Sequence, residues 1–223
     1  MFDDGYYTIR QVMSPSPQVI ALTEETFIEG ISQLVARDRD LAQVQSKWGN
    51  PPFWTEPPDF SGLVHIILSQ QVSLASADAA FARLGGHIEP INPGSFLSLD
   101  DDTLKEIGFS RQKAGYVRGF ANSILQGEID LDEIELLVDD IVRVKLLMLK
   151  GIGPWTADIY LLMALRRSDI WPNGDLALAK AVQEIMNLES LPNREDLGAI
   201  AERWQPWRSV AARILWHYYL SER

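Results

Sequence analysis

The stretch LLMLKGIGPWTADIYLLMALRR, residues 146–167, sets two glycines and a proline between two apolar segments with helical periodicity. A glycine directly after a helix accepts a positive φ and closes the C-terminus of that helix. Proline suits the first turn of the next helix, where its missing N–H group is not needed. The tetrapeptide Gly151-Ile152-Gly153-Pro154 therefore predicts a tight helical hairpin, with Ile152 turned inward.

A structural turn between two helices accounts for every residue of this hairpin, but its chemistry also allows a second interpretation. Without side chains at Gly151 and Gly153, the backbone amides at a helix N-terminus can touch a phosphate, and Lys150 lies beside them. Such contacts position DNA without reading its sequence. The hairpin carbonyls are also candidate ligands for a structural Na⁺ or K⁺ that bridges to the phosphate, from Leu147, Leu149 and Ile152.

The composition limits the class of protein. The chain has 223 residues, 46% of them hydrophobic, which is enough for one compact domain or two interlocked lobes. No apolar run approaches the roughly 18 residues of a membrane span, and the N-terminus lacks the basic-then-apolar order of a secretory signal. The absence of cysteine excludes disulfides and thiolate-bound metals and is typical of a reducing compartment. We therefore expect a cytoplasmic protein with no membrane partner.

The net charge of −11, taken alone, argues against nucleic acid, because phosphate binding draws on lysine and arginine. The distribution of charge matters more than its sum. Residues 128–140 hold seven acids and no base, whereas residues 141–167 hold five bases and one acid. Residues 204–216 hold two arginines and no acid, and we predict that one of them, Arg208, binds DNA. On charge alone, ordinary solvated faces are an equal explanation.

Helical periodicity dominates the chain, and only DDGYYTIRQVM, residues 3–13, has the pattern of a short strand. Many short helices without alternating strands predict an all-α fold. We expect helices at about residues 24–36, 38–48, 59–85, 101–107, 110–126, 130–138, 140–149, 154–166, 175–187, 194–203 and 207–221.

Several motifs, in order along the chain, resemble one family. LKGIGPWTA (149–157) resembles the hairpin of the helix-hairpin-helix DNA glycosylases, and WPNGDLALAKAV (171–182) follows at the spacing of their catalytic aspartate. HIILSQQVSLASADAAFARL (65–84) resembles the early helix that carries their DNA-intercalating loop, and IGFSRQKAGYVRGFA (107–121) is similar to their next helix start. WQPWRSVAARILW (204–216) resembles the C-terminal helix of the 3-methyladenine, or alkylpurine, branch.

The resemblance covers about residues 60–220 and implies a two-lobed helical bundle with the active-site cleft between the lobes. We expect residues 1–223 to form one such unit. Its central lobe would span about residues 60–170 and include the hairpin at 146–167, and its second lobe would combine residues 1–59 with 171–223. The first 60 residues are too short for the complete extra α+β domain that some members carry.

The resemblance makes Asp175 the catalytic residue. A glycosylase that cuts the bond between base and sugar leaves an oxocarbenium-like sugar, which a carboxylate can stabilise. The sequence alone favours a helix N-cap at Asp175, since NGD precedes LALAKAV, and the two roles are compatible. Asp158, the competing carboxylate, is interpreted as a helix-surface or capping group.

The resemblance also assigns Gln71, in SQQVS, to the side chain that fills the space left by a flipped base. The alternative is a polar residue at a helix bend. Bifunctional relatives, which also nick the strand, carry a lysine at the position of Trp155 and form a Schiff base with the sugar. An indole cannot do so, and Trp155 therefore predicts a monofunctional enzyme that uses water and leaves an abasic site.

Two tryptophans, Trp155 and Trp216, match aromatic pocket positions of the alkylpurine branch, although core packing is the usual fate of tryptophan. Their faces would attract the positive charge of an alkylated purine by roughly 0.5–2 kcal/mol. Ile159 stands at a pocket position where the branch carries a tyrosine, and this implies a smaller, less aromatic pocket. Trp204 and Trp207 are expected to be structural.

The sequence therefore predicts an alkylpurine DNA glycosylase for base-excision repair that acts on damaged double-stranded DNA, needs no cofactor, and works as a monomer at the bacterial nucleoid. Two alternatives stay open: a related glycosylase for deaminated or mismatched bases, and a non-catalytic helix-hairpin-helix DNA-binding protein. Asp175 argues against the last, because a DNA binder has no need of a carboxylate near phosphates. The preferred lesion is not fixed by these residues.

Overall fold

The computed structural model describes residues 21–223, and in this range the protein consists of helices joined by short connections. The strand-like pairing recorded there is an isolated antiparallel bridge between Ala21 and Arg167. The predicted all-α fold is thereby confirmed. The short strand predicted at residues 3–13 lies outside the described residues. No helix within residues 21–223 has the length and apolar character needed to cross a membrane.

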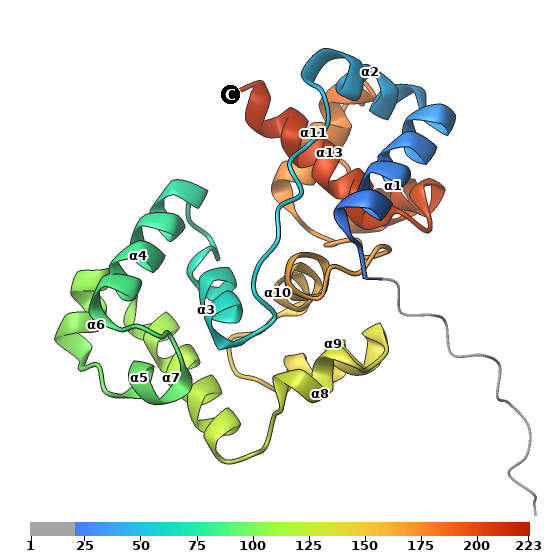
Figure 1. The fold of residues 1–223 in the computed structure, drawn as a ribbon. Helices are drawn as coiled ribbons and strands as arrows, with labels where there is room; N and C mark the ends of the chain where they lie inside the picture. Colours follow the sequence, from blue (N-terminus) through green and yellow to red (C-terminus); the bar gives the residue numbers. More distant parts are fainter. Residues whose placement is uncertain (1–20) are drawn as a thin grey trace, which may run out of the picture.

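One group of helices gathers around the C-terminal helix. α13 (Arg208–Ser221) packs against α1 (Glu24–Arg37), α2 (Arg39–Trp48) and α11 (Leu176–Ile185), as the upper part of Figure 1 shows. Residues 209–216 of α13 are buried without interruption, which identifies this helix as the centre of the group. The short α12 (Arg194–Ala201) leads through a 3₁₀ turn, η2 (Glu202–Trp204), into α13.

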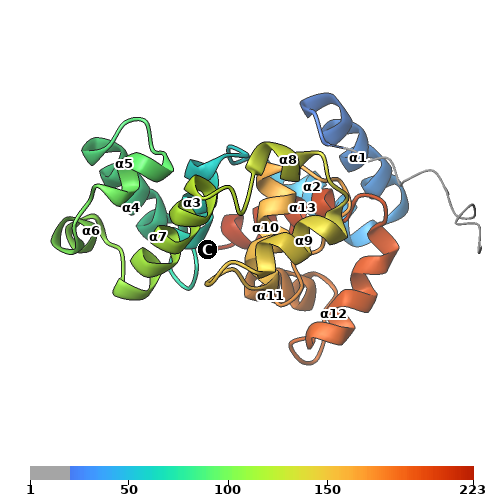
Figure 2. The ribbon, with the colours of Figure 1, turned by 90° about the horizontal axis from the view of Figure 1, so that it is seen from below.

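A second group is formed by consecutive segments: α3 (Phe60–Leu68), α4 (Leu74–His87), α5 (Pro93–Leu97), α6 (Asp101–Ile107) and α7 (Arg111–Leu125). Its core contains an aromatic cluster in which Phe60 stacks on Phe120 and meets Phe96 edge-on. Figure 2 shows this group at one end of the molecule and the α1, α2 and α13 group at the other. The exact lobe boundaries predicted from the sequence stay a prediction.

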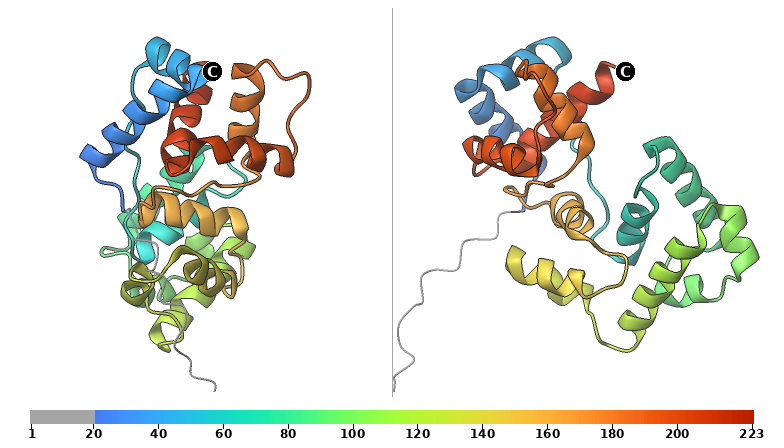
Figure 3. Two further views of the ribbon diagram at one scale, coloured as in Figure 1. Left: turned by 90° about the vertical axis from the view of Figure 1, so that its right-hand side faces the viewer. Right: turned by 180° about the vertical axis from the view of Figure 1, so that it is seen from behind.

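The hairpin helices lie between the two groups. α8 (Leu131–Glu135) and α9 (Asp139–Leu147) precede α10 (Pro154–Ile159), which continues into a π-helix, η1 (Tyr160–Ala164). α10 contacts both α9 and α3, and Figures 1 and 3 show it between the groups. The linker after α2 bonds to the π-helix: the Tyr160 hydroxyl donates to the Pro58 carbonyl, and the Glu56 N–H donates to the Met163 carbonyl.

Two helix predictions were wrong in detail, and one helix was missed. The single helix predicted at 59–85 is two helices, α3 and α4, because the chain breaks at residues 69–73, where Gln71 has a φ of 57°. The helix α5 was missed, although Asn92 and Ser95 form a capping box with Pro93 at the first turn. The helix predicted at 154–166 widens into a π-helix after Ile159, a feature often found at functional sites.

Candidate active site

The hairpin forms as the sequence predicts, and Gly151 is required by its geometry. Gly151 has a φ of 94°, and a Cβ added there would lie 2.2 Å from the ring of Tyr116 on α7. Ile152 is buried, and its N–H donates to the Leu149 carbonyl to close the turn at 3.1 Å. The first glycine therefore allows α7 to pack directly on the hairpin backbone.

The second glycine has a different environment. A Cβ added at Gly153 would meet no atom of the protein within 4 Å, and Gly153 begins α10 without a side-chain cap. The N-terminal amides of α10 thus have no side-chain cap to occupy them, and the packing of residues 21–223 does not demand a glycine there. Lys150 is exposed and forms no ion pair with any residue in 21–223. The phosphate contacts predicted for Lys150, Gly151 and Gly153 are compatible with this geometry and stay predictions.

The three carbonyls predicted to hold a monovalent cation are only partly free. The Leu149 carbonyl already accepts the Ile152 N–H, whereas no described backbone N–H outside a helix bonds to the carbonyls of Leu147 or Ile152. A carbonyl oxygen has two lone pairs, so all three retain capacity for a hard cation. The residues present therefore fit a Na⁺ or K⁺, which would supply positive charge beside a phosphate.

Asp175 is the N-cap of α11, as the sequence favours. Its Oδ1 accepts the N–H of Leu178 at 2.9 Å, and the preceding Gly174 has a φ of 92°, which turns the chain into the helix. Only 9% of Asp175 is exposed. The capping bond fixes the carboxylate at the start of α11, on the side that faces the hairpin.

The two tryptophans predicted for the pocket converge on this carboxylate. Trp155, two residues after Gly153, donates its indole Nε1–H to Asp175 Oδ2 at 2.9 Å. Trp216, from α13, donates its indole Nε1–H to Asp175 Oδ1 at 3.3 Å. Three segments that are far apart in the sequence thus meet at one carboxylate, and two aromatic rings border it.

The donors that reach the Asp175 carboxylate are all neutral, namely a backbone amide and two indoles. They orient the carboxylate without cancelling its charge. Asp158 differs, because Arg143 Nε lies 2.7 Å from its Oδ1. Burial raises the pKa of Asp158, and the Arg143 guanidinium opposes that rise. The expectation that Asp158 lies on a helix surface was wrong, since it is buried against α9.

Four other residues considered for the pocket or its surroundings are buried. Tyr160 is buried beside Ile159, and burial raises its pKa. The indole of Trp204 donates to Asp38 and that of Trp207 donates to Gln33, in agreement with the expected structural roles. Ile159 is buried at the end of α10, and its place in a base pocket stays a prediction.

Gln71 lies in the turn between α3 and α4, exposed and in the left-handed region. Its neighbour Gln70 reaches the hairpin, where its amide donates to the Gly151 carbonyl and to the Thr156 hydroxyl. The predicted wedge and the predicted phosphate clamp therefore lie next to each other in space. The intercalating role of Gln71 stays a prediction.

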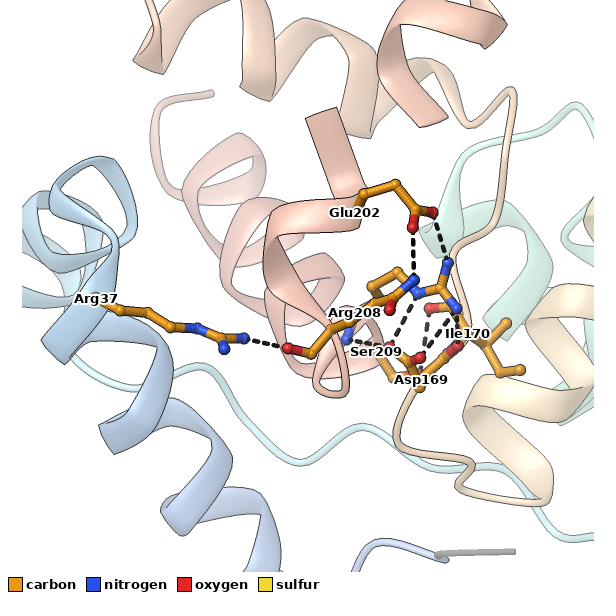
Figure 4. Close-up of polar contacts among 7 residues, drawn as sticks. Arg37, Asp169, Ile170, Glu202, Arg208 and Ser209 are labelled. Atoms are coloured by element: carbon orange, nitrogen blue, oxygen red, sulfur yellow. Dashed lines mark hydrogen bonds and ion pairs between the residues drawn. The ribbon is translucent and has the colours of Figure 1, made fainter. Parts of the chain in front are cut away.

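Arg208 has protein partners that the sequence did not reveal. Figure 4 shows its guanidinium against Asp169, with Nε and Nη2 each 2.9 Å from a carboxylate oxygen, and Nη1 3.2 Å from Glu202. The adjoining Ser209 hydroxyl accepts the Ile170 N–H, so these contacts fix the start of α13. A bidentate pair of this kind leaves few donors for a phosphate. The structure thus gives Arg208 a structural role, and its predicted DNA contact stays a prediction.

Comparison with known proteins decides the family. Residues 64–206, which include the hairpin, Asp175 and Trp204, match the HhH-GPD superfamily of base excision DNA repair proteins. The chain belongs to this superfamily. The resemblance seen in the sequence is thereby confirmed.

Proteins that are named as DNA glycosylases or glycosidases are similar to this chain. A Bacillus subtilis protein named putative DNA-3-methyladenine glycosylase YfjP is 31% identical over 124 residues, 56% of this chain and 43% of the relative, so this chain spans less than half of that protein. The Schizosaccharomyces pombe alkylbase DNA glycosidase-like protein mag2 is 27% identical over 80% of this chain and 91% of its own length.

A solved superfamily structure also has the same fold. The Schizosaccharomyces pombe 3-methyladenine DNA glycosylase Mag1, in complex with abasic DNA, superposes with a TM-score of 0.78 at 26% identity and covers 84% of this chain and 95% of its own. Neighbours of this kind, solved with DNA, support DNA as the partner of this chain.

Proposed function

We propose that this chain is a monofunctional DNA glycosylase that hydrolyses the N-glycosidic bond of alkylated purines in double-stranded DNA and leaves an abasic site. The observation that carries the proposal is that Trp155 and Trp216 both donate their indole N–H groups to the carboxylate of Asp175, beside the glycine hairpin. The names of the relatives support the alkylated-base class, and their sequences extend over most of this chain.

The proposed reaction begins with extrusion of the damaged nucleotide. Flipping the nucleotide out of the duplex costs a few kcal/mol of stacking and pairing, and Gln71 fills the vacated space. The hairpin amides and Lys150 hold the strand by its phosphates. The extruded base then stands between the indole faces of Trp155 and Trp216, which favour a cationic purine over a neutral one.

Cleavage is proposed to rely on Asp175. As the bond from sugar to base breaks, positive charge develops on the sugar, and a carboxylate with only neutral donors stabilises that charge. The alkylated base departs as a neutral molecule, so no general acid is required. Water adds to the sugar cation, Asp175 orients it, and the added water loses a proton to the solvent.

The residue at position 155 sets the reaction type in this proposal. The indole of Trp155 has no amine to attack the sugar, so borohydride treatment during the reaction is expected to trap no covalent protein–DNA adduct. A trapped adduct would contradict a monofunctional mechanism. The nearby Lys150 is exposed and precedes the hairpin, and its substitution by methionine serves as the control for adventitious trapping.

The deciding experiment is an excision assay on N-methylated duplex DNA that scores both the free base and the abasic site. Release of methylated purines with abasic sites supports the proposal. Release of only deaminated or mismatched bases would favour the related glycosylase, and tight binding without release would favour a DNA-binding protein. A panel of lesions in the same assay reads out the effect of Ile159 on substrate range, and gel filtration with DNA tests the proposed monomer.

A further inference from the structure

The turn that carries Gln71 is attached to the hairpin by one side chain. The amide nitrogen of Gln70 lies 3.0 Å from the carbonyl oxygen of Gly151 and 2.9 Å from the hydroxyl oxygen of Thr156. These two acceptors stand on either side of Gly153, one in the hairpin turn and one in the first turn of α10. Thr156 is buried and Gln70 is half-buried, so the contact is shielded from competing water.

A second side chain holds the same turn from α7. The Lys113 ammonium donates to the carbonyls of Leu68 and Gln70, at 2.7 Å each. In a continuous helix, these two carbonyls would accept the N–H groups of residues 72 and 74. Burial lowers the pKa of Lys113, which has no carboxylate partner in residues 21–223. The ammonium therefore satisfies the carbonyls that the break in the helix leaves open.

Gln71 lies directly beyond both attachments. Its backbone is left-handed, with a φ of 57°, a conformation that a residue other than glycine adopts only when its surroundings impose it. Gln70 and Lys113 supply these surroundings, since they fix the peptide groups on the N-terminal side of Gln71. The Gln71 side chain itself is exposed and makes no hydrogen bond within the described residues.

We propose that Gln70 and Lys113 are positioning residues that couple the Gln71 wedge to the glycine hairpin, so that holding the strand and filling the gap of the flipped base occur as one event. This inference rests on the proposed function. In this proposal, Gln70 in SQQVS makes contacts within the protein, and Gln71 makes contacts with DNA. A strand held by Gly151 and Gly153 would thus stand at a fixed distance from the wedge.

A chemistry-independent experiment tests this coupling. The probe is duplex DNA with a tetrahydrofuran abasic analogue opposite 2-aminopurine, whose emission rises when the base is unstacked. Affinity and emission are measured for the wild type, Gln70→Ala, Gln71→Ala and the double variant. Gln70→Ala is expected to lower affinity about tenfold and to reduce the emission change, because the turn must then be ordered on binding, at a cost on the scale of two net hydrogen bonds. In the Gln71→Ala background the same substitution is expected to change affinity less than about twofold.

The controls separate positioning from folding. Gln126→Ala removes an exposed glutamine at the end of α7 and is expected to bind like the wild type. Thr156→Val keeps the volume of the side chain but removes one acceptor of Gln70, and it is expected to lower DNA affinity about threefold. This variant replaces Gln70→Ala if Gln70→Ala proves too unstable to assay. Thermal melts of each variant check that the fold is retained.

Two results for the variants would overturn the inference: an equal loss of affinity for Gln70→Ala with and without Gln71, or no effect of Gln70→Ala on either readout. A wild-type protein that leaves 2-aminopurine emission unchanged overturns it as well. Because the probe cannot be cleaved, these outcomes do not depend on excision, and failure of the proposed enzyme activity is seen separately in the methylated-DNA assay.

Discussion

Two buried aspartates in this protein, Asp38 and Asp175, are built from almost the same parts. Each caps a helix, with 8% and 9% of the residue exposed, and each accepts an indole N–H, from Trp204 at Asp38 and from Trp155 and Trp216 at Asp175. They differ in the presence of a charged partner. Arg203 Nε lies 2.9 Å from Asp38 Oδ2, whereas Asp175 has no ion pair within the described residues.

The comparison shows how the same scaffold produces two outcomes. The guanidinium neutralises Asp38, and the result is a structural joint between α2 and the η2 turn. Neutral donors orient Asp175, and no cation within the described residues forms an ion pair with it, which suits the proposed role of stabilising a developing positive charge. In the proposed mechanism, the absence of an arginine partner, and not the carboxylate itself, distinguishes Asp175 from Asp38.

The largest effect is expected on the excision rate when Asp175, the proposed catalytic residue, is substituted. Asp175→Asn keeps a good N-cap residue but removes the charge, so the excision rate on methylated duplex DNA is expected to fall by about 10²–10³-fold. Because the asparagine amide nitrogen cannot accept the indole N–H group that now bonds to one carboxylate oxygen, the unfolding free energy is expected to fall by about 1–3 kcal/mol. Single-turnover kinetics and a melting curve check both values. Turnover like that of the wild type would remove Asp175 from the mechanism.

Substitution of Asp38 tests the structural role of the other aspartate. Asp38→Ala removes the cap of α2 and leaves Trp204 and Arg203 without their shared partner, at a cost of about 2–4 kcal/mol of unfolding free energy. Urea denaturation measures this loss. The excision rate per folded molecule is expected to stay at the wild-type value, and a large loss of rate in folded protein would break the contrast between the two aspartates.

The indoles around Asp175 allow a finer test. Trp155→Phe keeps an aromatic face but loses the N–H group that orients Oδ2, and the excision rate is expected to fall about tenfold, on the scale of one hydrogen bond to a charged group. Trp204→Phe is the matched control, since it removes the corresponding donor from Asp38. If Trp155→Phe excises as fast as the wild type, the indole acts only through its face.

The smallest effect is expected for a substitution that makes the surroundings of Asp38 more like those of Asp175. Arg203→Met leaves Asp38 with amide and indole donors only, the two kinds of donor that Asp175 has. Because 44% of the Arg203 side chain is exposed, the loss is expected to be about 1 kcal/mol. Denaturation at low and high salt measures it, and the difference from the wild type should shrink at high salt. A loss of several kcal/mol would show that Asp38 does not tolerate the Asp175 environment.

The hairpin and the cap at Asp175 could be predicted because both depend on local chemistry. Glycine and proline specify the turn within four residues, and an aspartate before an apolar helix specifies a cap. The convergence of Trp155 and Trp216 on Asp175 followed from the family resemblance, because no local pattern links residues 155, 175 and 216. Sequence reasoning could therefore name the site but not its hydrogen bonds.

The contacts that sequence reasoning missed involve partners far away in the chain. Arg208 was assigned to DNA because residues 204–216 hold no acid, and its ion pair with Asp169, 39 positions upstream, was not predicted. Helical periodicity runs through residues 59–85 without interruption, and the carbonyls at the break bond to Lys113, 43 positions from Gln70. The role of Gln70 was missed for the same reason, since adjacent glutamines give no sign of which faces the protein.

The most direct test of the account is binding to a charged sugar mimic. The affinity for duplex DNA with a cationic pyrrolidine abasic analogue is compared with that for the neutral tetrahydrofuran analogue, in the wild type and in Asp175→Asn. An uncompensated Asp175 predicts that the wild type prefers the cation by about tenfold or more and that Asp175→Asn loses the preference. The same preference in both proteins would contradict the claim that Asp175 stabilises a positive sugar.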